Sequence, residues 1–293
     1  MSSAAAALDA TAPVARARPN RVLAVVLRPR IAGPLAFIVL VSVLSLLAPV
    51  LAPMDPVEMN PGQKLQPPGV DTVLGTDEFG RDILSRLLYG GRVSLVVAIC
   101  AVIIADVFGI LFGMVGGYFG GTWEMVTMRA VDVLLSIPPI LLAIAVVAFL
   151  GSSLTNLILV TGILFMPRSA RIVHGSTLSV RQREFITAAR VVGAGAPRIL
   201  MRGILPNILA PIIVQASVSL GFAILLESGL AFLGLGAPPP TPSWGGMIGA
   251  GRGFMQISAW LVFWPALVIW TTILAFNILG DGLRDALDPR LRG

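Results

Sequence analysis

Long apolar runs separated by polar segments dominate the chain. A helix needs about 20 mostly apolar residues to cross the hydrocarbon core of a bilayer. These runs are too long and too uniformly apolar to be the strands of a membrane barrel. They are predicted to be helices, because lipid cannot form hydrogen bonds with free backbone groups. The predicted transmembrane helices are Leu35–Leu51, Val93–Met114, Val131–Leu150, Leu154–Met166, Ile208–Leu226 and Ala259–Leu279. The pattern therefore predicts an all-α membrane protein with six transmembrane helices.

The basic residues predict the orientation of these helices. Cytosolic segments carry an excess of Lys and Arg, and most of the 21 fall on one side if the N-terminus is cytosolic. Both termini are then cytosolic. The resulting organisation is a largely disordered cytosolic tail (1–32), a first transmembrane helix (33–52), an external loop (53–92), a core domain with five transmembrane helices (93–280) that includes a cytosolic loop (167–206), and a cytosolic C-terminus (281–293).

The first apolar run follows several arginines, so it has two interpretations. It is either a cleaved secretory signal or a permanent membrane anchor. Its apolar core exceeds the roughly 7–15 residues of a signal peptide, which favours the anchor. Cleavage would leave the orientation of the other five helices unchanged.

Composition narrows the function classes. Only 12% of residues are charged and 56% are hydrophobic, against about 25% charged in soluble domains. This excludes a disordered chain and disfavours a soluble enzyme. The net charge of +6 and the pI near 10.9 mostly record the asymmetry of the cytosolic loops, so no nucleic-acid partner is expected. Membrane lipid is the expected surrounding.

The chain lacks the residues for common catalytic sites. One Cys and one His exclude an intrachain disulfide framework and multi-histidine metal sites. The single lysine, Lys64, lies outside any phosphate-binding motif, and no nucleophile elbow is present. We expect no metal, no cofactor and no catalysis on this chain. His174 is expected at the surface of a helix end, and Cys100 as a small packing residue.

Polar residues within the apolar runs are candidates for the translocation path. Asp106 is the best candidate for an internal polar contact, whereas Asp132 is expected to pair with Arg129 on the same helical face. Glu227 is expected to reach the membrane interface. Pro138 and Pro139 should kink or break the third helix, and such kinks either line transporter cavities or are static packing bends.

The most informative segment is Arg181–Asn207. Its first part, Arg181–Val192, predicts an amphipathic helix. Gly193 and Gly195 then favour a turn, and Pro197 suits the first turn of a second short helix. This helical pair could dock into another protein, or it could lie on anionic lipid headgroups.

This segment resembles the cytosolic signature of binding-protein-dependent ABC transporter permeases. That signature has Glu-Ala-Ala, a Gly after three residues, and a later Leu-Pro. The matching positions are Thr187-Ala188-Ala189, Gly193 and Leu205-Pro206. Thr187 departs from the usual Glu, and Glu184, one turn earlier, is the candidate to replace it. Gly203 departs from the larger residue that is common there.

Further motifs resemble the dipeptide/oligopeptide/nickel permease group. They occur in the order expected for that group and extend from about residue 33 to the end. The matching segments are Leu74–Arg86, Gly90–Leu95, Glu227–Gly236, Pro242–Gly245 and Asn277–Asp285.

The resemblance implies a type I ABC importer permease fold in the bacterial cytoplasmic (inner) membrane, with residues 93–280 as its core permease domain. It implies a second homologous permease subunit, two ATPase subunits that carry ATP and magnesium, and an external solute-binding protein. Di- and oligopeptides are the expected substrates. Nickel, another small solute, or a proton-coupled secondary transporter are the alternatives.

The resemblance also assigns roles to residues. The expected ATPase-coupling residues are Arg183, Glu184, Thr187, Ala188, Ala189, Gly193, Gly195, Leu205 and Pro206. The external residues Asp77, Glu78, Arg81 and Asp82 are candidates for docking the binding protein or the second permease. The alternative for these four residues is a structural cap over the helices.

Overall fold

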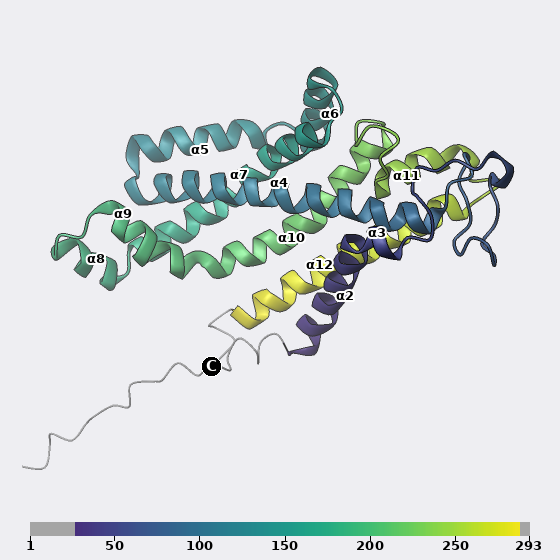
Figure 1. Ribbon diagram of the computed structural model, residues 1–293. Coiled ribbons are helices and arrows are strands. Elements are labelled where there is room, and N and C mark those ends of the chain that lie inside the picture. Colours follow the sequence, from purple (N-terminus) through teal and green to yellow (C-terminus); the bar gives the residue numbers. More distant parts are fainter. Residues whose placement is uncertain (1–26, 288–293) are drawn as a thin grey trace, which may run out of the picture.

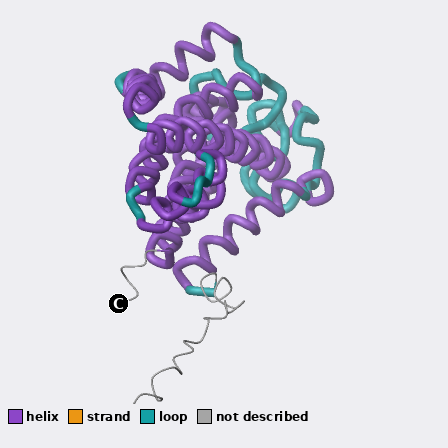
Figure 2. The backbone as a smooth tube through the Cα atoms, turned by 90° about the vertical axis from the view of Figure 1, so that its left-hand side faces the viewer, coloured by secondary structure: helices purple, strands orange, loops and turns teal. Residues whose placement is uncertain are grey.

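The computed structural model describes residues 27–287 of the chain. Within those residues all regular secondary structure is helical (Figures 1 and 2). The helices in chain order are α2 (Pro29–Leu46), α3 (Ala48–Leu51), η1 (Pro61–Gln63), α4 (Ile83–Phe119), α5 (Gly121–Leu135), α6 (Pro139–Leu150), α7 (Leu154–Arg181), α8 (Glu184–Val191), α9 (Ala196–Arg198), η2 (Ile199–Ile204), α10 (Leu205–Phe232), α11 (Trp244–Gly251), η3 (Arg252–Phe254) and α12 (Trp260–Leu287).

Five of these helical segments are long and apolar enough to cross a membrane, and the sixth predicted crossing is a broken pair. The third apolar run is not one helix, because α5 and α6 meet at 86°. Pro138 and Pro139 lack amide hydrogens, and each also disfavours the α conformation of the residue before it. Helix α6 therefore starts afresh with Pro139 in its first turn. The sequence predicted this break but not its angle.

Several helices continue beyond the apolar runs. Helix α4 begins at Ile83 rather than Val93, because the Asp82 carboxylate caps it by accepting a hydrogen bond from the backbone N–H of Ser85. Helix α7 continues through Pro167 to Arg181, so much of the expected cytosolic loop is helical. Hydropathy indicates which residues lie in the hydrocarbon core, whereas capping and packing determine where each helix begins and ends.

Helices α4 and α7 run parallel to each other and form the most extensive helix contact of the described chain. Three glycines one turn apart on α4, Gly109, Gly113 and Gly117, face α7. A Cβ atom at Gly113 would lie 2.6 Å from the carbonyl oxygen of Ala170. Small residues at such spacing let membrane helices approach closely, so the glycines set the distance between α4 and α7.

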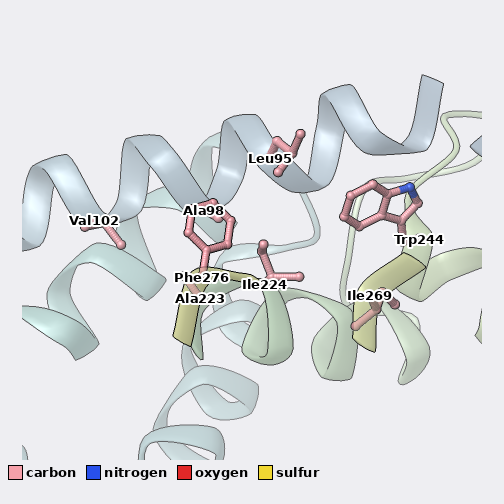
Figure 3. Close-up of a cluster of buried hydrophobic side chains, with 8 residues drawn as sticks. All are labelled: Leu95, Ala98, Val102, Ala223, Ile224, Trp244, Ile269 and Phe276. Atoms are coloured by element: carbon pink, nitrogen blue, oxygen red, sulfur yellow. The ribbon is translucent and has the colours of Figure 1, made fainter. Parts of the chain in front are cut away.

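The largest core cluster joins four helices. Trp244 of α11 is 1% exposed, and its indole N–H donates to the carbonyl of Leu87 on α4 at 3.0 Å. Figure 3 shows the cluster between α4, α10 and α12. Its buried members are Leu95, Ala98, Val102, Ala223, Ile224, Trp244, Ile269 and Phe276. Helix α11 is therefore anchored to the bundle.

The two ends of the described chain lie at the same end of the bundle. The Arg30 guanidinium pairs with the Asp285 carboxylate at 3.4 Å, and α2 packs closely on α12 where Gly282 faces Ile31. We call this the inner end, because α8 and α9 extend from the same end of the bundle (Figure 1). The opposite end, with α11, is the outer end. Residues 1–26 and 288–293, which include most of the predicted N-terminal tail, lie outside the described residues.

Candidate functional site

A helical hairpin at the inner end carries most of the predicted coupling residues. We call residues 183–204 the inner hairpin. Helix α8 ends at a turn in which Gly193 has a φ of +81°, a conformation that only glycine adopts without strain. The Gly193 and Ala194 amides donate to the carbonyls of Arg190 and Ala189, both at 3.0 Å. The turn and the second short helix that begins near Pro197 agree with the sequence prediction.

Buried contacts make the inner hairpin a unit. Ile186 of α8 is 1% exposed and packs in a cluster with Ile199 and Ile204 of η2. A Cβ atom at Gly203 would lie 2.8 Å from the Cδ1 atom of Ile186. Gly203, which departs from the usual permease pattern, therefore leaves room for the Ile186 side chain.

The surface of the inner hairpin that faces away from the bundle is exposed and partly apolar. Val191 and Val192 are 84% and 85% exposed, and Phe185 in the first turn of α8 is also exposed. Contiguous exposed apolar side chains indicate an interaction surface. Arg190 is held over the ring of Tyr118 at 5.2 Å, which ties α8 to the end of α4.

The remaining coupling candidates divide into exposed and helix-bound residues. Arg183, Glu184, Thr187, Ala188 and Gly195 are exposed, and Ala189 is half-buried. Leu205 and Pro206 lie in the first turn of α10. They do not mark a break, because the helical path from Ala196 to Phe232 passes through the π-helical turn η2 without a loop.

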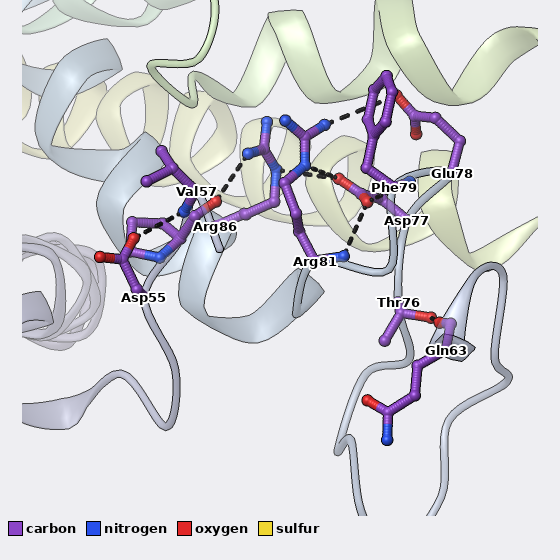
Figure 4. Close-up of polar contacts among 10 residues, drawn as sticks. Asp55, Val57, Gln63, Thr76, Asp77, Glu78, Phe79, Arg81 and Arg86 are labelled. Atoms are coloured by element: carbon purple, nitrogen blue, oxygen red, sulfur yellow. Dashed lines mark hydrogen bonds and ion pairs between the residues drawn. The ribbon is translucent and has the colours of Figure 1, made fainter. Parts of the chain in front are cut away.

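Three of the four external candidates, Asp77, Glu78 and Arg81, form a polar cluster with Arg86 (Figure 4). The Asp77 carboxylate accepts from the amides of Phe79 and Arg81, at 2.9 and 3.0 Å, and from Nε of Arg81 at 2.6 Å. Nε of Arg86 lies 3.4 Å from the same carboxylate. Asp77, Arg81 and Asp82 are all buried.

This arrangement favours the structural cap that the sequence left as an alternative. The Arg86 guanidinium also donates to the carbonyl of Pro56 at 2.8 Å, so the cluster fastens the loop before α4. Glu78 and Phe79 border a cleft of about 460 Å³ that reaches Arg252 and the Pro239–Thr241 segment. Any external partner would meet the rim of this cleft rather than the Asp77 carboxylate.

The acidic residues of the apolar runs have defined partners. The Ser169 hydroxyl on α7 donates to the Asp106 carboxylate at 2.7 Å, as expected for an internal contact. Asp132 pairs with Arg171 of α7 at 2.7 Å, so the expected pairing with Arg129 was wrong. The local spacing favoured Arg129, but the long Arg171 side chain reaches across from the neighbouring helix. The role of Asp106, Pro138 and Pro139 in the path stays a prediction.

Glu227 was expected to reach the membrane interface, but its side chain is buried inside the bundle. It is 0% exposed, the Ser228 hydroxyl donates to its Oε2 atom at 3.4 Å, and the hydroxyls of Ser94 and Ser243 also face the carboxylate. Ser94 lies in α4, Ser228 in α10, and Ser243 caps the N-terminus of α11. Glu227 therefore joins three elements at the outer end. Sequence spacing alone could not reveal this, because Ser94 and Ser243 are distant in the chain.

His174 also has a partner that the sequence did not indicate. Its Nε2 atom lies 3.1 Å from the Glu124 carboxylate of α5, and its side chain is 15% exposed. It joins α5 to α7 instead of lying free at the surface. Within residues 27–287 no group of three or more His, Cys, Asp or Glu residues could hold a metal ion.

Comparison with known proteins agrees with these features. Residues 109–293 match the family model described as the inner membrane component of binding-protein-dependent transport systems. The chain is 44% identical to the dipeptide transport system permease protein DppC of Haemophilus influenzae, over 88% of this chain and 90% of that protein. It is 46% identical to the glutathione transport system permease protein GsiD of Escherichia coli O1:K1, over 88% and 85%.

A solved structure shows the same fold. A chain of the MetNI methionine ABC transporter in an inward-facing conformation matches with a TM-score of 0.57 and 19% identity. The match covers 69% of this chain and 97% of that one. The fold is that of a type I ABC importer permease, located in the bacterial inner membrane with several membrane crossings. The chain belongs to the family of inner membrane components of binding-protein-dependent transport systems.

Proposed function

We propose that this chain is a permease subunit of an ATP-driven importer and that it passes di- and oligopeptides across the cytoplasmic membrane. Relatives that cover most of its length are named for dipeptide, di/tripeptide and glutathione transport, and all of these are short peptides. The observation that carries the coupling role is the rigid inner hairpin with an exposed apolar tip at Val191 and Val192.

The proposed machine has four further components. A second homologous permease completes the passage, two ATPase subunits bind ATP and magnesium, and an external solute-binding protein delivers the substrate. Membership of the family implies ATPase and binding-protein partners, and the number of each is part of the proposal. The chain itself performs no catalysis. Its single lysine, Lys64, precedes Leu65, which packs against the cluster that contains Met247 of α11 at the outer end, far from where a cytosolic nucleotide would bind.

The inner hairpin is proposed to transmit motion from an ATPase subunit. Val191, Val192 and Phe185 would enter a groove on that subunit, and small Ala188 would permit close approach. Glu184 is proposed to make the contact that the family Glu makes at the position of Thr187. When the ATPases close, the hairpin moves as a rigid body and rocks the helices between inward- and outward-open states.

The coupling proposal is tested with the double variant Val191→Asp and Val192→Asp. Both side chains are almost fully exposed, so the fold should persist while the apolar contact with the ATPase is lost. Two contacts worth more than about 1 kcal/mol each predict at least a tenfold drop in substrate-stimulated ATP hydrolysis by the purified complex. The matched control, Val70→Asp, changes a fully exposed valine in the outer loop and should leave hydrolysis unchanged. Wild-type hydrolysis by the double variant would refute the proposal.

The substrate proposal requires a separate measurement. Vesicles that contain the complete complex should take up a labelled dipeptide with its binding protein and ATP. Nickel uptake in place of dipeptide uptake would favour the nickel alternative. Uptake driven by a proton gradient without ATP would favour a secondary transporter. Asp106 and Glu227 argue against it, because each accepts a hydrogen bond from a serine and the two are not linked to each other as a proton relay.

A further inference from the structure

Helices α5 and α7 carry exposed charged side chains at a depth where contact with lipid would be unfavourable, and α4 provides the measure of that depth. In α4 the only charge between Arg92 and Phe119 is Asp106, so this part of α4 marks the hydrocarbon core. At 1.5 Å per residue, Asp106 lies about 20 Å from Val93, and the core is about 30 Å thick. Groups level with residues 106–113 of α4 therefore lie within the inner half of the core.

Contacts between α4 and α7 place two arginines at this level. Ser169 donates to Asp106 at 2.7 Å, and the carbonyl of Ala170 faces Gly113. Arg168 and Arg171 flank these two residues, so both begin at the same depth. Arg171 pairs with Asp132 of α5, which brings a carboxylate to that depth as well. Helices α5 and α7 lie beside each other (Figure 1).

These charges are exposed on the isolated chain. The Asp132 side chain is 51% exposed and that of Arg171 is 57% exposed, and Arg168 is also exposed. A charge at the centre of a lipid-facing helix costs about 2.5–3.5 kcal/mol on insertion scales, and the cost is smaller but still unfavourable in the inner half of the core, where these side chains lie. An isolated Arg could extend toward the headgroups, but Arg171 is held by the short Asp132 side chain at 2.7 Å.

The opposite face of α4 at the same depth has a different chemistry. Val107, Phe108 and Leu111 are exposed there, and they border a groove of about 540 Å³ whose lining residues are all apolar. That face suits lipid or an apolar protein surface. The exposed charges of α5 and α7 therefore differ from the apolar face of α4 at the same depth.

We propose that this charged side lines the water-filled translocation path. Its residues, which we call the inner polar stripe, are Asp132, Arg168, Arg171 and Gly175. The three α7 residues are spaced i, i+3 and i+7, so they lie on one face of the helix. The inference rests on the proposed function and adds the residues that a passing zwitterionic peptide meets. These are the paired Asp132 carboxylate and Arg171 guanidinium, together with the Arg168 guanidinium, which lies over the Phe222 ring at 5.3 Å.

Cysteine labelling tests whether the stripe meets water. The chain has one cysteine, so Cys100→Ala gives a cysteine-free background. Arg168→Cys is placed on the stripe within the core, Gly175→Cys at the inner end of the stripe, level with Gly116 and Gly117 of α4, and Leu111→Cys is the control on the apolar face. Gly175 has open space around a Cβ atom, so its variant should fold.

The probe is a negatively charged methanethiosulfonate, applied to the complete complex in inside-out vesicles without ATP. Thiolate, which forms in water, is the reactive species. Both stripe cysteines should therefore react at least about tenfold faster than the control. Equal rates at Arg168→Cys and Leu111→Cys, or an unreactive Arg168→Cys, would overturn the inference, because Arg168 is the labelled stripe position that lies within the core.

A functional variant adds a second readout. Asp132→Asn leaves Arg171 without its counter-charge and should lower dipeptide uptake at equal abundance of the complex. The control Asp285→Asn breaks the similarly exposed pair with Arg30 at the helix ends and should leave uptake unchanged. Unaltered uptake by Asp132→Asn would count against the stripe.

The wild-type complex separates the two proposals. ATP-driven dipeptide uptake by the wild type with unlabelled stripe cysteines overturns the stripe alone. Labelled stripe cysteines in a complex that takes up no dipeptide overturn the proposed substrate and support a water-filled path for another solute.

Discussion

The close approach of α4 and α7 gives a sharp prediction at Gly113. The added Cβ atom of Gly113→Ala would lie 2.6 Å from the carbonyl oxygen of Ala170 and 2.7 Å from the Cβ atom of Val173. Neither atom can rotate away, because one is backbone and the other is the branch point of a buried side chain. Favourable contacts need about 3.5–4.0 Å, so the helices must separate by about 1 Å.

Two opposing terms set the size of the effect. Alanine is favoured over glycine in a helix interior by about 1 kcal/mol, whereas overpacking a tight contact costs about 1–3 kcal/mol. Separation of the helices also loosens the contacts at Gly109 and Gly117, so the cost should fall at the upper end of that range. We expect Gly113→Ala to destabilise the folded chain by about 1–2 kcal/mol.

The control has the same chemistry without the contact. At Gly33 of α2, no atom outside its own stretch of helix lies within 4 Å of the place that a Cβ atom would take, so Gly33→Ala should be neutral or slightly stabilising. The assay heats the purified complex and measures the remaining folded fraction by size-exclusion chromatography. A change of 1 kcal/mol corresponds to about 2–4 °C for 150–250 residues. Equal melting temperatures for Gly113→Ala and the wild type would refute the claimed approach of α4 to α7.

Two further predictions concern the polar cluster around Asp77 and the inner hairpin. Asp77→Asn leaves Arg81 and Arg86 without their shared carboxylate, which should cost about 3–5 kcal/mol of folding stability and expose residues 53–82 to protease. The control Asp71→Asn changes an exposed residue and should leave the protease resistance unchanged. Equal resistance of both variants would contradict the structural cap. Gly193→Ala forces alanine into a left-handed conformation, which costs about 1–2 kcal/mol, and it should speed proteolysis of the inner hairpin. The control Gly195→Ala, at a position with a φ of −67°, should leave the cleavage rate unchanged. Equal cleavage rates for the two variants would count against the left-handed turn at Gly193.

Hydropathy and the helix-breaking Pro and Gly residues predicted much of the architecture, because both signals depend on residues that are close together in the chain. The apolar runs indicated six crossings, and the prolines at 138 and 139 indicated the break between α5 and α6. Gly193 marked the turn of the inner hairpin, because its left-handed conformation excludes most other residues. Each of these features depends only on residues that are close together in the chain.

The remaining features depend on residues that are distant in the chain. Arg171 replaced Arg129 as the partner of Asp132 because helix packing brings α7 beside α5. Glu227 is buried because serines from two other segments surround it. The α4 glycines could have been noticed from their spacing of four residues, a known signal for close membrane helices, but only the structure identifies α7 as the partner.

The unbroken helical path from Ala196 to Phe232 has a consequence for how the two mouths of the passage are linked. Its 37 residues extend about 55 Å at 1.5 Å per residue, which exceeds the thickness of the bilayer. A helical path that tilts as one body about its middle moves its two tips in opposite directions. One tilt would thus narrow the cytosolic mouth while widening the external one, so that both mouths need not open together and ions need not leak through.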